Sequence, residues 1–338
     1  MVVVMKSNAT DEEIDGVVSK VREAAGEAFV SRGKTRTIIG LVGDTGAFMA
    51  MPLETLPGVE NVIQVGKPYK LVARESHPHP SMVKIGPAAV GREQFSVIAG
   101  PCAIESADQS LGAARAAKAA GATILRGDAY KARTSPYSFQ GTTKIGLEIL
   151  AACRAETGLP VVTEVMEPGD VDHVADVADA LKVGARNMQN FSLLKEVGKS
   201  GKPVMLKRGL SATVEEWLMA AEYIAQQGNT DIVLCERGIR TFEPATRNTL
   251  DLSGMVVAQQ ETHLPVIVDP SHATGRHDLV APMSKAALAA GADGVMIDVH
   301  PHPTDALCDG PQALQPHELQ SLTAELAALA QALGRPLA

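Results

Sequence analysis

The chain has 338 residues, which is enough for one large domain and a small one, and its 45% hydrophobic and 21% charged residues are ordinary for a globular protein. Its net charge of −8 argues against nucleic acid as a main partner, because binding to a phosphate backbone needs a basic surface. The apolar start is too short for a signal peptide and no apolar run approaches a membrane span, so we expect a cytoplasmic protein that does not bind membranes.

The first 72 residues predict a small ferredoxin-like α+β domain. A β-branched run opens the chain, and a helix with Thr10 as its N-cap follows and ends near Gly26. The later strands are expected at residues 27–31, 35–42 and 62–65, with a turn at 32–34 and a short helix before the last strand. This βαββαβ order is that of ferredoxin-like modules. Residues 73–92, which include three prolines, are expected to be a linker.

Residues 93–338 predict a (β/α)8 barrel. Short apolar runs recur along this part of the chain with helical stretches between them, as expected of parallel strands that are buried on both faces. The runs are residues 95–100, 122–127, 160–165, 180–185, 203–208, 231–236, 265–270 and 294–299. Such a series of strand–helix units is typical of the α/β TIM-barrel fold, and a doubly wound open sheet is the alternative.

Ionisable residues follow these runs, where the active site of a barrel would lie. Arginine and lysine predominate, and they bind carboxylate and phosphate groups, which predicts a focused anion site in an acidic protein. The expected anion-binding residues are Arg126, Arg186, Lys207 and Arg237, with a second cluster at Lys131, Arg133, Thr134 and Ser135. Two clusters predict two phosphorylated substrates, although loop capping is an alternative role for Thr134 and Ser135.

A second set of side chains predicts a metal site. Cys102, His272 and Asp298 follow the first, seventh and eighth runs, and Asp309 lies in the loop after the eighth. Because a barrel closes its eighth strand against its first, these positions are expected to be neighbours in space. A thiolate, an imidazole and carboxylates together bind a divalent transition ion. The cysteines show no CxxC spacing, so neither a disulfide framework nor a zinc knuckle is expected.

Several motifs resemble those of the 3-deoxy-D-arabino-heptulosonate 7-phosphate (DAHP) synthase family. The segment Gly100-Pro101-Cys102-Ala103-Ile104-Glu105 resembles a signature shared with 3-deoxy-D-manno-octulosonate 8-phosphate (KDO8P) synthases. Residues 131–141, KARTSPYSFQG, are similar to a loop of the DAHP branch. Shorter matches follow in order at residues 184–187, 206–209, 235–238 and 269–272. The N-terminal module is similar to that of the type I beta subgroup.

The resemblance implies an aldol-type condensation of phosphoenolpyruvate with erythrose 4-phosphate and water, giving DAHP and phosphate at the start of the shikimate pathway to aromatic amino acids. It places phosphoenolpyruvate on Arg126, Lys131, Arg186, Lys207 and Arg237, and the aldose phosphate on Arg133, Thr134 and Ser135. It also implies a divalent metal, Mn2+ before Zn2+, Co2+ or Fe2+, on Cys102, His272, Asp298 and Asp309. Lys131 or a metal-bound water is the expected proton donor, and Glu164 is expected to place the attacking water.

The chain departs from the family pattern at Asp128, where Gly is usual, at Ala132, where Pro is usual, and at Asp298, where Glu is usual. Ala132 loosens its loop, and Asp298 is one methylene shorter than the usual ligand. One alternative function is condensation with another aldose, such as arabinose 5-phosphate in KDO8P synthases. A Schiff-base aldolase using Lys207 and a non-catalytic barrel that regulates a partner enzyme are two others.

The N-terminal domain supplies no catalytic groups, so it is expected to be dispensable for the reaction, and the resemblance implies a regulatory role for it. The resembling subgroup uses this domain for feedback inhibition by tyrosine or phenylalanine. Ser31, at the end of a strand, is a candidate contact, with a simple turn residue as the alternative. Allostery requires a ligand that binds two states differently, which implies a hinge in the linker and contacts between subunits. We therefore expect a homo-oligomer, either a dimer or a homotetramer.

Overall fold

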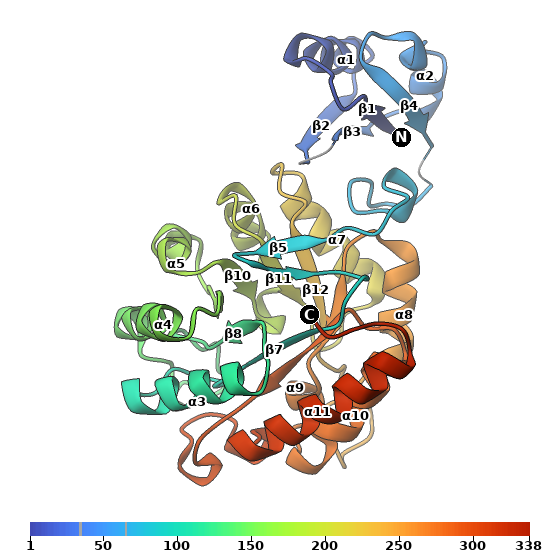
Figure 1. The fold of residues 1–338 in the computed structure, drawn as a ribbon. Coiled ribbons are helices and arrows are strands. Elements are labelled where there is room, and N and C mark those ends of the chain that lie inside the picture. The colour runs from blue at the N-terminus through green and yellow to red at the C-terminus, as the bar shows by residue number, and fades with distance from the viewer. Residues whose placement is uncertain (34–35, 65) are drawn as a thin grey trace.

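The chain folds into a small N-terminal domain and a large barrel, which lie one above the other in Figure 1. The structure is a computed structural model that describes residues 1–33, 36–64 and 66–338. Within these ranges, none of the helices combines the length and the apolar character that crossing a membrane requires.

The N-terminal domain has the predicted βαββαβ order. Its elements are β1 Val2–Met5, α1 Asp11–Glu23, β2 Glu27–Arg32, β3 Thr37–Val42, α2 Thr45–Met49 and β4 Val59–Ile63. The strands form one antiparallel sheet in the order β2-β3-β1-β4. Thr10 caps α1 in a reciprocal capping box with Glu13, which explains where the helix begins. The predicted turn and two of the predicted strands extend to positions 34, 35 and 65, which lie outside the described residues.

Both faces of this sheet are covered, and alternate residues of β1 show how. Val3 and Met5 pack with the two helices in the core of the N-terminal domain. Val2 and Val4 point to the other face, where they join the main core together with Leu71. A strand with apolar residues on both faces is typical of a sheet that lies between two layers.

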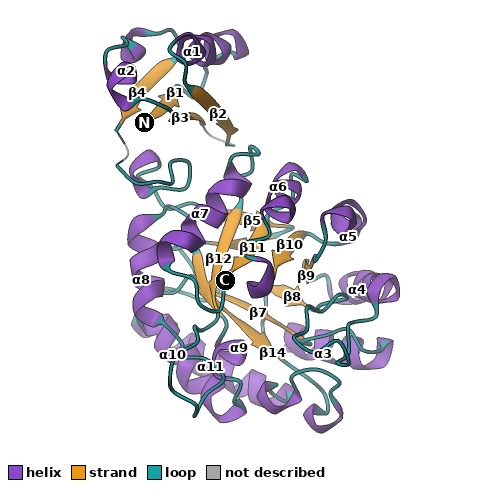
Figure 2. Ribbon diagram, turned by 180° about the vertical axis from the view of Figure 1, so that it is seen from behind, coloured by secondary structure: helices purple, strands orange, loops and turns teal. Residues whose placement is uncertain are grey.

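The barrel contains all eight predicted strands in one closed parallel sheet, with helices around it (Figures 1 and 2). The strands are β7 Ser96–Gly100, β8 Ile124–Arg126, β9 Val161–Glu164, β10 Ala180–Val183, β11 Val204–Lys207, β12 Ile232–Glu236, β13 Val266–Val268 and β14 Gly294–Asp298. The helices are α3 Ala107–Ala119, α4 Thr143–Thr157, α5 Val171–Val177, α6 Phe191–Lys199, α7 Val214–Ala225, α8 Leu252–Glu261, α9 Pro270–Thr274, α10 His277–Ala289 and α11 Pro316–Ala332. Since β14 pairs with β7, the ends of the last and first barrel strands are neighbours, as predicted.

The segment predicted as a linker contains a β-hairpin that fills the N-terminal mouth of the barrel. Its strands β5 Val83–Ile85 and β6 Ala88–Val90 pair antiparallel, and Val83, Ile85 and Val90 are fully buried. These three side chains pack with residues that point into the barrel. The segment is therefore part of the barrel core and not a simple connector, because apolar side chains that a linker would expose are removed from water.

The junction between the two domains is held by buried polar groups. The Glu222 carboxylate in α7 accepts hydrogen bonds of 2.9–3.1 Å from the backbone N–H groups of residues 70–72. The ring of His263 bonds to the Leu71 carbonyl (3.0 Å) and to the Ser81 hydroxyl (2.7 Å). Burial lowers the pKa of His263 to about 3, so this ring is neutral at physiological pH.

Candidate active site

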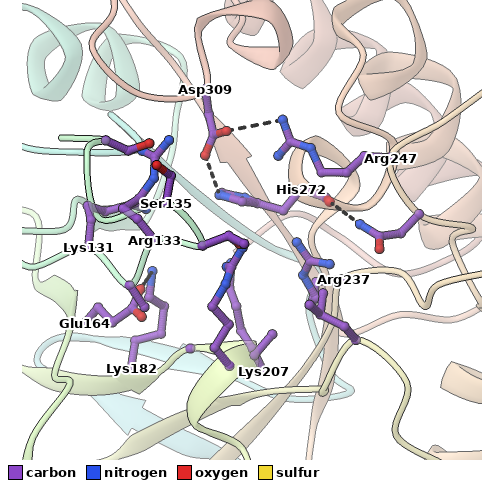
Figure 3. Close-up of a pocket in the computed structure, with 18 of the residues that line it drawn as sticks. Lys131, Arg133, Ser135, Glu164, Lys182, Lys207, Arg237, Arg247, His272 and Asp309 are labelled. Atoms are coloured by element: carbon purple, nitrogen blue, oxygen red, sulfur yellow. Dashed lines mark hydrogen bonds and ion pairs between the residues drawn. The ribbon is translucent and has the colours of Figure 1, made fainter. Parts of the chain in front are cut away.

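A cavity of about 410 Å³ lies at the C-terminal ends of the barrel strands (Figure 3). The residues that line it include Lys131, Arg133, Thr134, Ser135, Glu164, Lys182, Arg186, Lys207, Arg237, Arg247, His272 and Asp309. Eight of the lining residues are lysine or arginine and two are carboxylates, although the whole chain is acidic. Such a cavity attracts a small anion that carries several charges.

The polar groups of this cavity lie at two depths. Lys182 on β10 and Lys207 on β11 are only 2% and 4% exposed, and they rise from the barrel strands in Figure 3. Arg133 is half-buried, and Thr134 and Ser135 are exposed in the loop after β8. The buried lysines can therefore hold one anionic group at the bottom of the cavity while the loop holds another near the solvent.

Asp128 joins three cations below the cavity. Its Oδ2 lies 3.0 Å from Arg126 Nη2, 2.9 Å from Lys131 Nζ and 2.6 Å from Lys182 Nζ, and all four side chains are buried. Burial raises the pKa of Asp128, but the charges of Lys131, Lys182 and Arg126 outweigh it and hold that pKa well below its usual range. The carboxylate is therefore ionised, and it neutralises part of the positive charge that an anionic ligand would meet.

Arg126 lies beneath the cavity and not in its wall. Its guanidinium is fully buried and donates to Asp298 Oδ1 at 2.6 Å and to the Pro101 carbonyl at 2.9 Å. The other oxygen of Asp298 accepts a hydrogen bond of 2.6 Å from Gln312 Nε2. Sequence analysis expected Arg126 to bind substrate and Asp298 to bind metal, whereas in this structure the two side chains are paired with each other.

Asp269 connects Lys207 to His272. Its Oδ2 forms an ion pair with Lys207 Nζ and lies 2.9 Å from His272 Nδ1, which is not aligned for a hydrogen bond. Burial lowers the pKa of Lys207, but the charge of Asp269 outweighs it and raises that pKa overall. Lys207 is therefore an ammonium ion, which suits anion binding and does not suit the amine nucleophile of a Schiff-base aldolase.

Four donor atoms from four side chains converge beside the cavity. Cys102 Sγ lies 3.5 Å from His272 Nε2, 3.2 Å from Asp309 Oδ2 and 3.7 Å from Cys308 Sγ. Asp309 Oδ2 lies 3.6 Å from His272 Nε2 and 3.5 Å from Cys308 Sγ. Asp309 has a φ of 54°, a left-handed conformation that is uncommon for a residue other than glycine and is often kept at functional sites. These donors and their convergence fit a divalent transition ion.

The protonation states of these donors show what a metal ion would have to displace. A hydrogen bond between the two thiols, together with burial, raises the pKa of Cys102, and the same bond lowers the pKa of Cys308 against the effect of burial. Burial lowers the pKa of His272, but Asp269 and Asp298 outweigh it and raise that pKa to about 10. The ring carries a proton in the absence of a metal, so a metal that binds here must displace it.

The structure brings most of the predicted site residues together and adds four that the sequence did not reveal. Cys102 lies directly behind the cavity wall and is 4% exposed. The added residues are Lys182, Arg240, Arg247 and Cys308. A lysine inside an apolar barrel strand is a signal that could have identified Lys182. Arg247, in the loop between β12 and α8, pairs with Asp309 at 3.2 Å, and no motif in the sequence marks it.

A second cavity, of about 590 Å³, lies between the N-terminal domain and the opposite end of the barrel. Ser31 and Arg32 of β2, His77, and the loops that precede β11 and β12 line it. Ser31 is 1% exposed, and its Oγ has no hydrogen-bond partner within the described part of the chain. A buried hydroxyl without a partner is unfavourable, so this cavity suits a ligand with a polar group.

Comparisons with known proteins identify the family and several relatives of this chain. A profile of the DAHP synthetase I family matches residues 69–334, and one of the DAHP synthase ferredoxin-like domain matches residues 1–67. A phospho-2-dehydro-3-deoxyheptonate aldolase of Thermotoga maritima is 48% identical over 99% of both chains. A 2-dehydro-3-deoxyphosphooctonate aldolase of Magnetococcus marinus is 34% identical over 70% of this chain and 87% of its own.

Two solved structures show the same fold. The crystal structure of the Thermotoga maritima DAHP synthase matches 100% of this chain and 99% of its own, with a TM-score of 0.79 and 46% identity. A truncated form of the DAHP synthase from the same organism matches 80% of this chain and 99% of its own, with a TM-score of 0.75 and 46% identity. Both the barrel and the complete two-domain arrangement therefore have counterparts of known structure.

Proposed function

The chain belongs to the DAHP synthetase I family, and on that basis we propose that it condenses phosphoenolpyruvate with erythrose 4-phosphate and water to give DAHP and phosphate. The observation that carries the proposal is the cation-lined cavity, because both substrates bear phosphate and one also bears a carboxylate. The reaction would be the first step of the shikimate pathway, and we place it in the cytoplasm.

We assign phosphoenolpyruvate to the deep part of the cavity. Arg186 and Arg237 offer planar guanidinium groups that bind carboxylate or phosphate through two hydrogen bonds. Lys131, Lys182 and Lys207 supply charge from below. The family resemblance also assigns Arg126 to this substrate. In the structure Arg126 lies beneath these cations and forms an ion pair with the Asp128 carboxylate, which also contacts Lys131 and Lys182.

We assign the phosphate of erythrose 4-phosphate to the loop after β8. Arg133, Thr134 and Ser135 line the open side of the cavity and combine one cation with two hydroxyl groups. The Arg186 guanidinium donates a hydrogen bond of 2.8 Å to Thr134 Oγ1. The two substrates would therefore meet near this contact, as a reaction that joins them requires.

The reaction forms a bond between C3 of phosphoenolpyruvate and the aldehyde carbon, and negative charge develops on the aldehyde oxygen. A divalent metal on Cys102, His272 and Asp309 would supply Lewis-acid polarisation of that oxygen. The charge of Asp128 outweighs the burial that lowers the pKa of Lys131, so this group stays an ammonium ion that can stabilise the developing oxyanion. Lys131 or a metal-bound water remains our candidate proton donor to the new hydroxyl.

Glu164 is our candidate for placing the water that adds to C2 before phosphate leaves. Its carboxylate lines the cavity and lies 3.3 Å from Lys182 Nζ, which orients it. A Cβ at Gly184 would lie 2.2 Å from Glu164 Oε1, so any larger residue there would displace this carboxylate. Gly184 therefore leaves room for Glu164 in its present position.

Consumption of phosphoenolpyruvate tests the proposal. We expect turnover with erythrose 4-phosphate that a chelator abolishes and Mn2+ restores, and little turnover with arabinose 5-phosphate. The 48% identity to a heptonate aldolase over nearly the whole chain favours erythrose 4-phosphate over the octulosonate alternative. Faster turnover with arabinose 5-phosphate would refute the choice of aldose, and activity that a chelator does not affect would refute the metal dependence.

The cavity between the domains is our proposed regulatory site. We propose that tyrosine or phenylalanine binds there, with Ser31 Oγ as one hydrogen-bond partner, and that the enzyme is a homo-oligomer, either a dimer or a tetramer. The cavity lies at the opposite end of the barrel from the active site, so inhibition would have to act through the barrel or through subunit contacts.

A further inference from the structure

Cys308 lies at the proposed metal site, and its Sγ is 3.7 Å from Cys102 Sγ and 3.5 Å from Asp309 Oδ2. We propose that Cys308 replaces Asp298 as a metal ligand, so that the ion is held by two thiolates, His272 and Asp309. The inference rests on the metal dependence proposed above and changes the expected ligand set. It follows from the positions of the Asp298 and Cys308 side chains and from the spacing of the donor atoms of Cys102, Cys308, His272 and Asp309.

Asp298 is poorly placed to bind the ion. Each of its carboxylate oxygens already has a partner at 2.6 Å, Arg126 for one and Gln312 for the other. Its closest contact with His272 is to Nδ1, at 3.5 Å, whereas Cys102 and Asp309 face Nε2. The lone pairs of the two ring nitrogens point in divergent directions, so an ion bound at Nε2 lies away from Asp298.

Another grouping is also compact, since Cys102, His272 and Asp298 offer donor atoms within 4.8 Å of one another. The Asp298 oxygen nearer to His272 is Oδ2, so a ligand role for it in that group would compete with the hydrogen bond of 2.6 Å from Gln312 Nε2. Cys102, Cys308 and Asp309 form a second compact group that involves no such competition. The second group together with His272 Nε2 is therefore the better ligand set.

Five of the six distances between these donor atoms fit a tetrahedral site. Two thiolates at ~2.3 Å from a tetrahedral ion lie ~3.8 Å apart, and the two Sγ atoms are 3.7 Å apart here. Pairs that involve nitrogen or oxygen are expected at ~3.4–3.6 Å. The distances from Cys102 to His272 and to Asp309, and from Asp309 to His272 and to Cys308, measure 3.2–3.6 Å.

Two cations lie beside the cysteines and would offset part of the negative charge of two thiolates bound to an ion. Lys131 Nζ lies 3.2 Å from Cys102 Sγ, and Arg133 Nη1 lies 2.7 Å from Cys308 Sγ. Two thiolates make the site softer than one thiolate with two carboxylates, so the ligand set favours Zn2+, Co2+ or Fe2+ over Mn2+. Asp298 is thereby left to hold Arg126 in place.

Cobalt substitution of the full-length enzyme tests the inference. The metal-free protein is titrated with Co2+, and the bound metal and the thiolate-to-Co2+ charge-transfer absorption are measured. We expect one Co2+ per chain and a band that falls to about half in Cys308→Ser, because one of two thiolates is lost. Cys153→Ser, which changes a buried cysteine in α4, is the matched control and should keep the full band. Asp298→Asn should also keep it.

A full band in Cys308→Ser with Co2+ bound would overturn the inference, as would loss of Co2+ binding in Asp298→Asn alone. If the wild-type protein takes up no Co2+ or Zn2+, the proposed metal dependence fails as well, so the two failures can be told apart. X-ray absorption of the zinc-loaded wild-type enzyme needs no variant. We expect two sulfur ligands at about 2.3 Å, and one sulfur would refute the assignment.

Discussion

The buried carboxylate of Asp128 leads to a prediction about stability in the presence and absence of substrate. Asp128→Asn keeps the shape of the side chain but removes the charge that faces Arg126, Lys131 and Lys182 at 2.6–3.0 Å. Removing one partner from a buried ion pair costs about 3–5 kcal/mol. We take the lower end, about 3 kcal/mol, because Asp298 still pairs with Arg126 and Glu164 with Lys182.

This loss of about 3 kcal/mol corresponds to a measurable decrease in Tm. The entropy of unfolding is about 2.1 cal/mol/K per residue, or about 0.7 kcal/mol/K for 338 residues, so Tm should fall by about 4 °C. Phosphoenolpyruvate would then supply the missing negative charge. Its stabilising effect, measured by thermal unfolding with and without the ligand, should therefore be larger in Asp128→Asn than in the wild-type protein.

Asp293→Asn is a matched control, because Asp293 is a fully buried carboxylate that pairs with Arg335 and lies outside the cavity lining. It should lower Tm without changing the shift that phosphoenolpyruvate causes. An unchanged Tm in Asp128→Asn, together with a shift equal to that of the wild-type protein, would refute the idea that this carboxylate stands in for a substrate charge.

Three further predictions concern the two substrates, the domain junction and regulation. Arg186→Lys loses a two-bond contact worth about 1.5–3 kcal/mol, so it should raise the phosphoenolpyruvate KM at least about tenfold and the aldose KM much less. Arg133→Ala should do the reverse. Equal effects of either change on both KM values would contradict the two-site assignment. The pKa of His263 is lowered to about 3 in the folded protein from 6.5 in the unfolded chain, so the neutral ring's contribution to stability is complete above pH 6.5 and is lost as pH falls toward 3. In denaturant titrations at a series of pH values, His263→Gln should weaken the dependence of the unfolding free energy on pH. An unchanged pH dependence would contradict the neutral, buried state of this ring. A chain that starts at Lys70 should keep its activity and lose inhibition by tyrosine or phenylalanine, and a full-length enzyme that ignores both amino acids would refute the regulatory site.

The architecture could be predicted from sequence because its signals are local. Each barrel strand is a short apolar run, and the helix cap at Thr10 lies within one turn of the helix that it starts. The hairpin at residues 83–90 was missed, because the prolines around it resemble a connector and its burial depends on the barrel that it fills. Such a segment is recognised only when the distant strands are in place.

The site was predictable at the level of residue types and less so at the level of pairs. Reading the strand ends identified the cations, but Lys182 stands inside a strand and was overlooked. The sequence also could not show that Asp298 faces Arg126, or that Cys308 faces Cys102. These contacts join residues that are 172 and 206 positions apart, so they depend on the folded barrel and cannot be seen in any local pattern of the sequence.

The two depths of the cavity have a kinetic consequence. With the hairpin of residues 83–90 filling the N-terminal mouth of the barrel, substrates reach Lys182 and Lys207 from the loop side, past Arg133 and its neighbours. An aldose phosphate that sits on this loop would stand in the path of phosphoenolpyruvate. If the proposed assignments hold, we expect a compulsory order of addition, with phosphoenolpyruvate binding first and the aldose phosphate closing the path behind it.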